Sequence, residues 1–143
     1  MRYTPAQYER KVKKWARKSP EAIERGLRKA AVEIIGEARA HHLSGPKMAK
    51  GRGGGFMGST LAAPTGTLKR SLSRADAIRI NVKPGQVRAQ VGTNVSYGRA
   101  HEYGSRKRNL PERPFLRPSV QTQRKRTLQL ISDEYIGAYK RGR

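Results

Sequence analysis

One long amphipathic stripe constrains the fold of this 143-residue chain more than any other feature of its sequence. Ser19-Pro20-Glu21 is a strong helix start, and after it the charges of residues 19–43 cancel, with four basic and four acidic side chains. Apolar residues follow at helical spacing as far as about His42, namely Ile23, Leu27, Ala30, Ala31, Ile34 and Ala38. The stripe predicts a neutral amphipathic helix that forms the backbone of the fold.

The segment before this stripe, residues 1–18, carries a net charge of +6 from seven basic residues and one acidic residue. Thr4-Pro5 resembles a helix start, and Tyr8, Val12 and Trp15 fall on one face. A separate helix ending near Lys18 is therefore expected. Two interpretations of its basic face stay open: a solvated surface on a helix docked by Trp15, or an arm that faces nucleic acid or a membrane surface.

Two runs of alternating residues predict a β-hairpin in the second half of the chain. Ile78, Ile80 and Val82 alternate with polar residues, as do the apolar positions of 87–91, and Lys83-Pro84-Gly85-Gln86 between them has the composition of a turn. One face of this hairpin is apolar and the other basic and polar. Because two strands alone are only marginally stable, the apolar face needs the long helices or a neighbouring subunit.

The remaining segments are loops and shorter helices. Residues 44–63 hold six glycines and no acid, which predicts a flexible basic loop. Residues 67–72 can form a short helical turn, residues 97–104 a short helix closed by Gly104, and a proline-rich stretch leads into a last helix. Its expected buried stripe is Leu116, Val120, Thr127, Leu128, Ile131, Tyr135 and Tyr139.

These elements predict a single α+β domain over residues 1–143, in which a small antiparallel sheet packs against long N- and C-terminal helices. It divides into the 1–18 arm, the 19–43 helix, the 44–63 loop, and the hairpin with the C-terminal helix in 64–143. The 32 Lys and Arg residues against 10 Asp and Glu residues give a net charge of +22. Such unbalanced charge opposes compaction, so we expect a large partner that carries negative charge.

Patterns of enzyme chemistry are poor in this sequence. Cysteine is absent, which removes disulfides, thiolate metal sites and thiol nucleophiles. His101-Glu102 lacks the second histidine of zinc-protease motifs, and adjacent His41 and His42 point about 100° apart on a helix. We therefore expect no catalytic, cofactor or metal site, no membrane span and no export signal. A metal-independent nuclease that uses one of these histidines is the least implausible enzyme.

Three segments, in this order, resemble one known family. Residues 65–72 (Thr-Gly-Thr-Leu-Lys-Arg-Ser-Leu), 97–104 (Tyr-Gly-Arg-Ala-His-Glu-Tyr-Gly) and 110–118 (Leu-Pro-Glu-Arg-Pro-Phe-Leu-Arg-Pro) resemble motifs of the tail-completion or "virion morphogenesis" proteins of tailed bacteriophages. Leu43-Ser44-Gly45 is similar to the end of that family's N-terminal helix. Gly98, where the family usually has alanine, and the long 44–63 segment depart from its pattern. The motif residues are Thr65, Gly66, Leu68, Tyr97, Glu102, Tyr103, Gly104, Arg113, Pro114, Phe115 and Leu116.

The resemblance implies a structural virion protein of the head–tail junction, assembled in the cytoplasm of the bacterial host. Such proteins form a ring, often of six copies, that joins the adaptor and head-closure proteins to the tail tube or tail terminator around the DNA channel. Within the motifs, we expect Arg113 to pair with Glu102.

Contact with DNA or acidic partner proteins is expected at exposed basic residues of the loops and the hairpin. The alternative function is that of a small basic protein that binds nucleic acid without sequence specificity. The contact candidates are Lys47, Lys50, Arg52, Arg79, Arg88, Arg106, Lys107 and Arg108.

Overall fold

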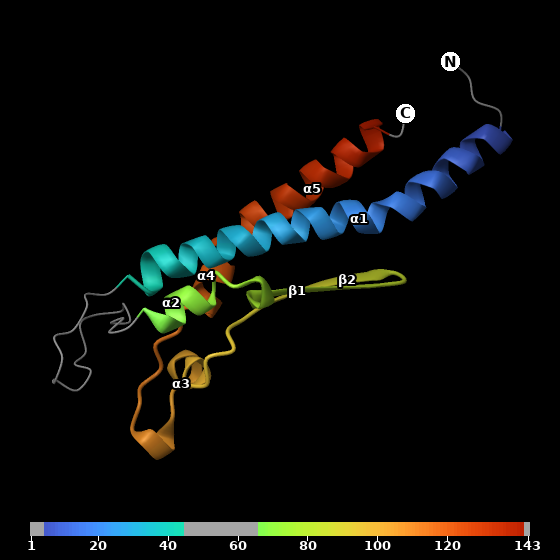
Figure 1. Cartoon of the computed structure of the whole chain (residues 1–143). Coiled ribbons are helices and arrows are strands. Elements are labelled where there is room, and N and C mark those ends of the chain that lie inside the picture. Colours follow the sequence, from blue (N-terminus) through green and yellow to red (C-terminus); the bar gives the residue numbers. More distant parts are fainter. Residues whose placement is uncertain (1–4, 45–65, 142–143) are drawn as a thin grey trace.

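A computed structural model describes residues 5–44 and 66–141, and it has the expected α+β architecture (Figure 1). One two-stranded antiparallel sheet is accompanied by helices that precede and follow it in the chain. The elements are α1 (Pro5–Glu37), the π-helical turn η1 (Ala38–His42), α2 (Thr67–Ser71), η2 (Ala75–Ala77), β1 (Ile78–Lys83), β2 (Gln86–Val91), α3 (Gly98–Tyr103), η3 (Arg106–Arg108), α4 (Leu116–Thr122) and α5 (Arg124–Arg141).

The N-terminal part of the chain forms one helix where the sequence predicted two. α1 runs through Pro20 without a break, so the expected boundary near Lys18 is wrong. A proline inside a helix removes one backbone N–H donor and crowds the preceding turn, which bends the helix without ending it when good helix formers surround it. In Figure 1 the axis of α1 changes direction in its N-terminal half, and its first turns extend past the end of α5.

The hairpin forms where the alternating pattern predicted it. β1 pairs with β2 in antiparallel register, from Ile78 opposite Val91 to Lys83 opposite Gln86. Gly85 adopts a φ of 75° in the turn, a left-handed conformation that glycine tolerates and that the Pro-Gly pair suits. The apolar face of both strands packs against α1, whereas the polar face is exposed along its whole length.

The C-terminal region differs from its expected single helix. Gln123 separates α4 from α5, and this break changes which side chains face inward. Thr127 and Ile131 are half-buried as predicted, but Val120, Leu128 and Tyr139 are exposed, with Leu128 retaining 61 % of its accessible surface. The predicted stripe is therefore correct only in part.

α5 lies antiparallel along α1 (Figure 1). Ion pairs join the two helices. Glu134 binds both Arg25 and Lys29, and Arg126 binds Glu33 at 3.2 Å. The hydrogen bonds from Lys29 and then Arg25 hold the pKa of Glu134 below its ordinary value. Glu33 of the predicted neutral helix thus neutralises a cation of α5, and Glu134 of α5 neutralises two cations of α1.

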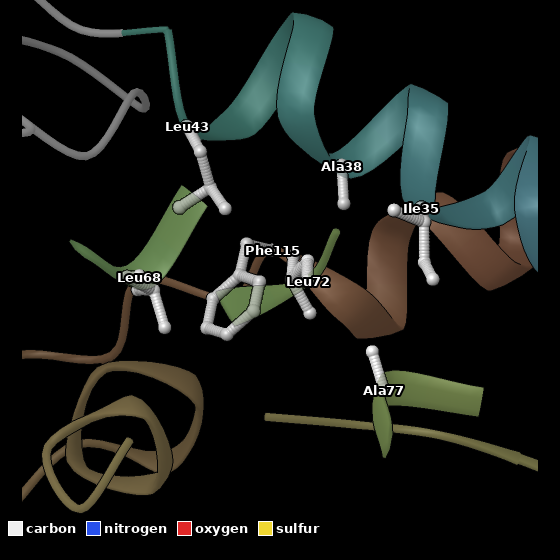
Figure 2. Packing of buried hydrophobic residues seen from close by; sticks show 7 residues of the cluster. All are labelled: Ile35, Ala38, Leu43, Leu68, Leu72, Ala77 and Phe115. Carbon is white, nitrogen blue, oxygen red and sulfur yellow. The ribbon is translucent and has the colours of Figure 1, made fainter. Parts of the chain in front are cut away.

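The core is small and gathers where three parts of the chain meet. Phe115, 1 % exposed, lies between the side chains of α2 and the end of α1 (Figure 2). The cluster consists of Ile35, Ala38, Leu43, Leu68, Leu72, Ala77 and Phe115. Figure 2 shows these side chains pointing toward one another from the α1–η1 region, from α2 and η2, and from the segment before α4.

Candidate functional site

The second and third motif segments meet at a buried carboxylate. Glu102, 5 % exposed, lies in α3, and its side chain reaches the first turn of α4. Its Oε2 accepts the backbone N–H groups of Phe115 at 2.8 Å and of Leu116 at 3.0 Å, and its Oε1 accepts that of Arg117 at 2.8 Å. The first N–H groups of a helix have no partner inside the helix, so Glu102 caps α4 from a different element.

Arg117, which the sequence analysis had not singled out, places a cation beside this carboxylate. The guanidinium of Arg117 lies 3.4 Å from Glu102 Oε1, donates to the Glu102 carbonyl oxygen at 2.6 Å, and donates to Glu112 at 2.9 Å. It also lies 5.0 Å from the centre of the Tyr103 ring. The hydrogen bond to Glu112 and the charges of both carboxylates raise the pKa of Arg117.

Gly104 makes the turn between the two motif segments possible. Its φ of 71° lies in the left-handed region, and a Cβ atom there would meet the Leu110 carbonyl oxygen at 3.1 Å. The following loop closes on itself, because Ser105 and Leu110 exchange backbone hydrogen bonds of 2.9 and 3.0 Å. Gly104 therefore brings residues 110–117 back to Glu102.

The first motif segment joins the same junction from its described part, which begins at Gly66. Leu68 and Leu72 pack in the core with Phe115, and the hydroxyl of Ser71 bonds to that of Thr93. A Cβ atom on Gly98 would lie 2.6 Å from the Thr93 methyl group. The packing beside Thr93 thus gives a local reason for glycine where the resembled family usually has alanine.

His101 packs against Tyr97 of the same segment. Its ring meets that of Tyr97 edge-on, with centres 5.7 Å apart, and its carbonyl oxygen accepts the Arg113 N–H at 2.7 Å. Burial, and then the charge of Arg113, lower the pKa of His101 below its ordinary value. Among residues 5–44 and 66–141, no group of three or more His, Asp or Glu side chains is placed to hold a metal ion.

The polar face of the hairpin brings together more cations than the sequence had singled out. Arg79 and Arg88 were candidates, and Lys83 shares their face because it lies an even number of residues from Arg79. Asn81, Gln86 and Gln90 complete the face, and all six side chains are exposed. A hollow of about 310 Å³ lies along it. The alternating pattern that predicted the strands therefore also placed Lys83 on the same face as Arg79.

A second cationic feature is the tip of the loop that follows α3. Arg106, Lys107 and Arg108 form η3, and all three side chains are exposed. The loop stands apart from the hairpin, at the far end of the α3 region in Figure 1. The structure therefore distributes the predicted cationic candidates over two separate surfaces. Thr65 and the candidates Lys47, Lys50 and Arg52 lie outside the described residues.

Exposed apolar side chains on the helices are a feature that the sequence analysis missed. Ile136 and Tyr139 on α5 are about half exposed, as is Val120 on α4, and Val32 on α1 retains 57 % of its surface. For Val120 and Tyr139, a buried stripe assigned on one unbroken helix was misleading, since the break at Gln123 changes the inward face. None of the helices in the described ranges has the length and apolar character needed to cross a membrane.

Comparisons with known proteins give one partial match. The chain is 32 % identical over 50 residues to the uncharacterized protein MJ0331 of Methanocaldococcus jannaschii. The match covers 35 % of this chain and 37 % of the archaeal protein, so the chain spans little more than a third of that relative's length. No family model matches the chain, and no solved structure matches it.

Proposed function

We propose that this chain is a structural protein of a bacteriophage head–tail junction, a neck or tail-completion protein without catalytic activity. Its copies form a ring around the DNA channel and join the head-closure complex to the tail tube. The observation that carries the proposal is the junction of the three motif segments. The first segment is separated from the second by residues 73–96, and the second from the third by the short loop 105–109. Leu68, Glu102 and Phe115 of the three segments contribute to one continuous packed and hydrogen-bonded unit.

This junction supports the resemblance because it gives each motif a physical role in one fold. The Glu-Tyr-Gly of the second motif supplies a buried cap and a left-handed turn, and the Arg-Pro-Phe-Leu of the third supplies the capped backbone and the core side chain. The motifs therefore maintain the subunit, and its contacts with neighbours lie elsewhere.

The exposed apolar side chains support an assembled state. Leu128, Ile136 and Tyr139 lie on α5, whose other side packs against α1. Each strand of the two-stranded sheet also has one edge without a strand partner among the described residues. A subunit with a lean core, exposed apolar helix surface and free strand edges gains stability from neighbouring copies.

The alternative is a monomeric basic protein that binds nucleic acid unaided. The exposed cations of the hairpin and of the 105–110 loop favour this alternative, since they supply charge without requiring a ring. The two functions differ in oligomeric state, which makes the mass of the particle in solution the decisive measurement.

The test is to purify the full chain alone and together with the portal-adjacent and tail proteins encoded beside it, and to measure masses by light scattering. We expect a closed ring, visible by electron microscopy, at least when a neighbouring protein is present. The double variant Leu128→Ser, Ile136→Ser should weaken the assembly, whereas the control Gln129→Ser on the same helix should not. A protein that stays monomeric with every such partner, yet binds nucleic acid tightly at physiological salt, would overturn the proposal in favour of the alternative.

A further inference from the structure

We infer that the polar face of the β1–β2 hairpin is a binding surface for the phosphodiester backbone of nucleic acid, contacted without reading its sequence. The face consists of Arg79, Asn81, Lys83, Gln86, Arg88 and Gln90. The inference rests on the geometry of this face alone, so it holds whether or not the chain assembles into a ring.

The face has a regular chemical pattern across the two strands. Arg79 lies opposite Gln90, Arg88 opposite Asn81, and Lys83 opposite Gln86. Each cross-strand pair therefore presents one cation and one amide, and successive pairs are about 7 Å apart along the ribbon. The three cations thus recur at equal steps along the ribbon, Arg79 and Lys83 from β1 and Arg88 from β2, and the charges of a linear polyanion also recur at equal steps.

These cations are available to an outside partner. Arg79, Lys83 and Arg88 make no ion pair with any residue in the described part of the chain, and residues 78–91 contain no acid. By contrast, Arg25, Lys29 and Arg126 on the helices are each held by a carboxylate. The opposite face of the ribbon packs on α1, which fixes the polar face outward.

The hollow along this face follows the line of the cations. It is about 310 Å³ in volume and continues toward the base of the hairpin, where a second hollow of about 240 Å³ shares Arg79 and Gln90. Asp76 lines the second hollow, and it is already engaged by Arg74 at 3.3 Å and by Asn94 at 3.2 Å. The anionic strand would therefore lie over the three cross-strand pairs and stop short of Asp76.

The composition of the face favours nucleic acid over an acidic protein. Stable protein–protein interfaces bury a core of aromatic and aliphatic side chains, with polar groups at the rim. All six side chains on this face are cations or amides, and Ile80 is the one apolar residue among those that line the hollow. Guanidinium and ammonium groups bind phosphate oxygens, and amides add hydrogen bonds to phosphate or sugar, which is the chemistry of backbone contacts to nucleic acid.

The experiment compares two triple variants that remove the same charge from different surfaces. The hairpin variant removes three positive charges from the polar face and carries Arg79→Gln, Lys83→Gln and Arg88→Gln. The loop variant is the control; it removes three positive charges from η3 and carries Arg106→Gln, Lys107→Gln and Arg108→Gln. Binding of the full chain to labelled duplex DNA, single-stranded DNA and stem-loop RNA is measured by fluorescence anisotropy over a series of salt concentrations. All three probes have a phosphodiester backbone. The probe that the protein binds most tightly identifies the kind of nucleic acid that this surface prefers.

The slope of log affinity against log salt counts the phosphates that are neutralised, at about 0.9 per contact on duplex DNA. We expect the hairpin variant to lose about 2 to 3 from this slope and the loop variant less than half as much. Adding a cation to the middle pair, by Asn81→Lys, should raise the slope by about 1. This gain is measurable even if the triple variant folds poorly.

Three results would overturn the inference. One is an equal or larger loss of slope in the loop variant, and another is an unchanged slope in both the hairpin variant and Asn81→Lys. The third is competition by polyglutamate as effective as that by duplex DNA at equal charge, which would indicate an acidic protein partner. A monomeric protein with a hairpin-dependent slope would refute the ring while supporting this inference, so the two failures are distinguishable.

Discussion

The carboxylate of Glu102 accepts the backbone N–H of Phe115 at 2.8 Å across a separation of 13 residues. This bond joins α3 to the start of α4 and holds Phe115 where its ring fills the core. The same carboxylate also accepts the N–H groups of the next two residues. One buried side chain thus satisfies three helix donors that would otherwise lack partners.

Glu102→Gln is expected to destabilise the fold by about 2 kcal/mol, because an amide NH₂ group would face backbone donors and the charge-assisted hydrogen bonds would be lost. Chemical denaturation monitored by circular dichroism measures this change. The matched control is Glu112→Gln, which removes an exposed carboxylate from the same Arg117. Equal destabilisation by the two variants would contradict the capping role of Glu102.

Gly26 and Gly36 on α1 form a second matched pair. A Cβ atom on Gly26 would lie 2.7 Å from the Ile131 Cα atom of α5, whereas one on Gly36 would meet nothing within 4 Å. Gly26→Ala should therefore destabilise the protein by about 1 kcal/mol, since the cost of overpacking exceeds the gain in helix propensity. Gly36→Ala should stabilise it by about 0.5 to 1 kcal/mol. The two thermal midpoints should move in opposite directions, and a rise in both would show that α1 and α5 do not pack closely at Gly26.

Local features of the fold could be predicted from the sequence because their causes are local. Alternation and the Pro-Gly turn specified both strands, and Gly104 ended α3 where the pattern placed it. The orientation of the hairpin faces, and with it the cationic face, followed from the same period of two. Among the cations of this face, only Lys83 was missed, although it lies an even number of residues from Arg79 in the sequence.

Features that depend on tertiary contacts could not be predicted in the same way. The position of Arg117 beside Glu102 depends on how α4 is oriented after Pro114, which no spacing rule specifies. The exposure of Leu128 depends on the break at Gln123, and an unbroken helix pattern gives no sign of it. The course of α1 through Pro20 likewise reflects a balance between a lost hydrogen bond and the surrounding helix formers.

Phe115 and Leu128 are predicted to respond very differently to truncation. Phe115→Ala should cost about 3 to 5 kcal/mol, because it empties the centre of the small core. Leu128→Ala should change the free energy of unfolding of the isolated subunit by no more than about 0.5 kcal/mol, since the side chain is largely exposed. Denaturant titrations of dilute protein measure both. A large loss for Leu128→Ala under those conditions would mean that the subunit itself buries this residue.

Pro20→Ala is expected to increase helical signal and to stabilise the protein by about 1 to 2 kcal/mol. The substitution restores a backbone N–H donor inside α1, and this gain exceeds the greater freedom of the unfolded chain. Glu21→Ala is the control, because it alters an exposed position in the same turn without adding a donor. If Pro20→Ala lowers both helicity and the thermal midpoint, the chain instead starts a second helix at Pro20, as the sequence pattern had suggested.

His101 should make stability fall as the solution becomes acidic. Burial and the charge of Arg113 lower its pKa in the folded protein below the value of about 6.5 in the unfolded chain. The unfolded chain therefore binds the extra proton more readily, and the contribution of this group declines as the pH falls below about 6.5 toward the folded pKa. Above about pH 6.5 both states are neutral at this residue, and the contribution is complete.

The measurement is the thermal midpoint between pH 7.5 and pH 5 for the native chain and for His101→Phe. Phenylalanine keeps an aromatic ring against Tyr97 and cannot titrate, so the variant should lose less stability over this range. The fold should tolerate phenylalanine at this position, since Nδ1 of His101 is buried without a hydrogen-bond partner and the substitution removes it. Parallel pH profiles for the two proteins would mean that the acid sensitivity arises from other groups, and a steeper profile for the variant would contradict the lowered pKa.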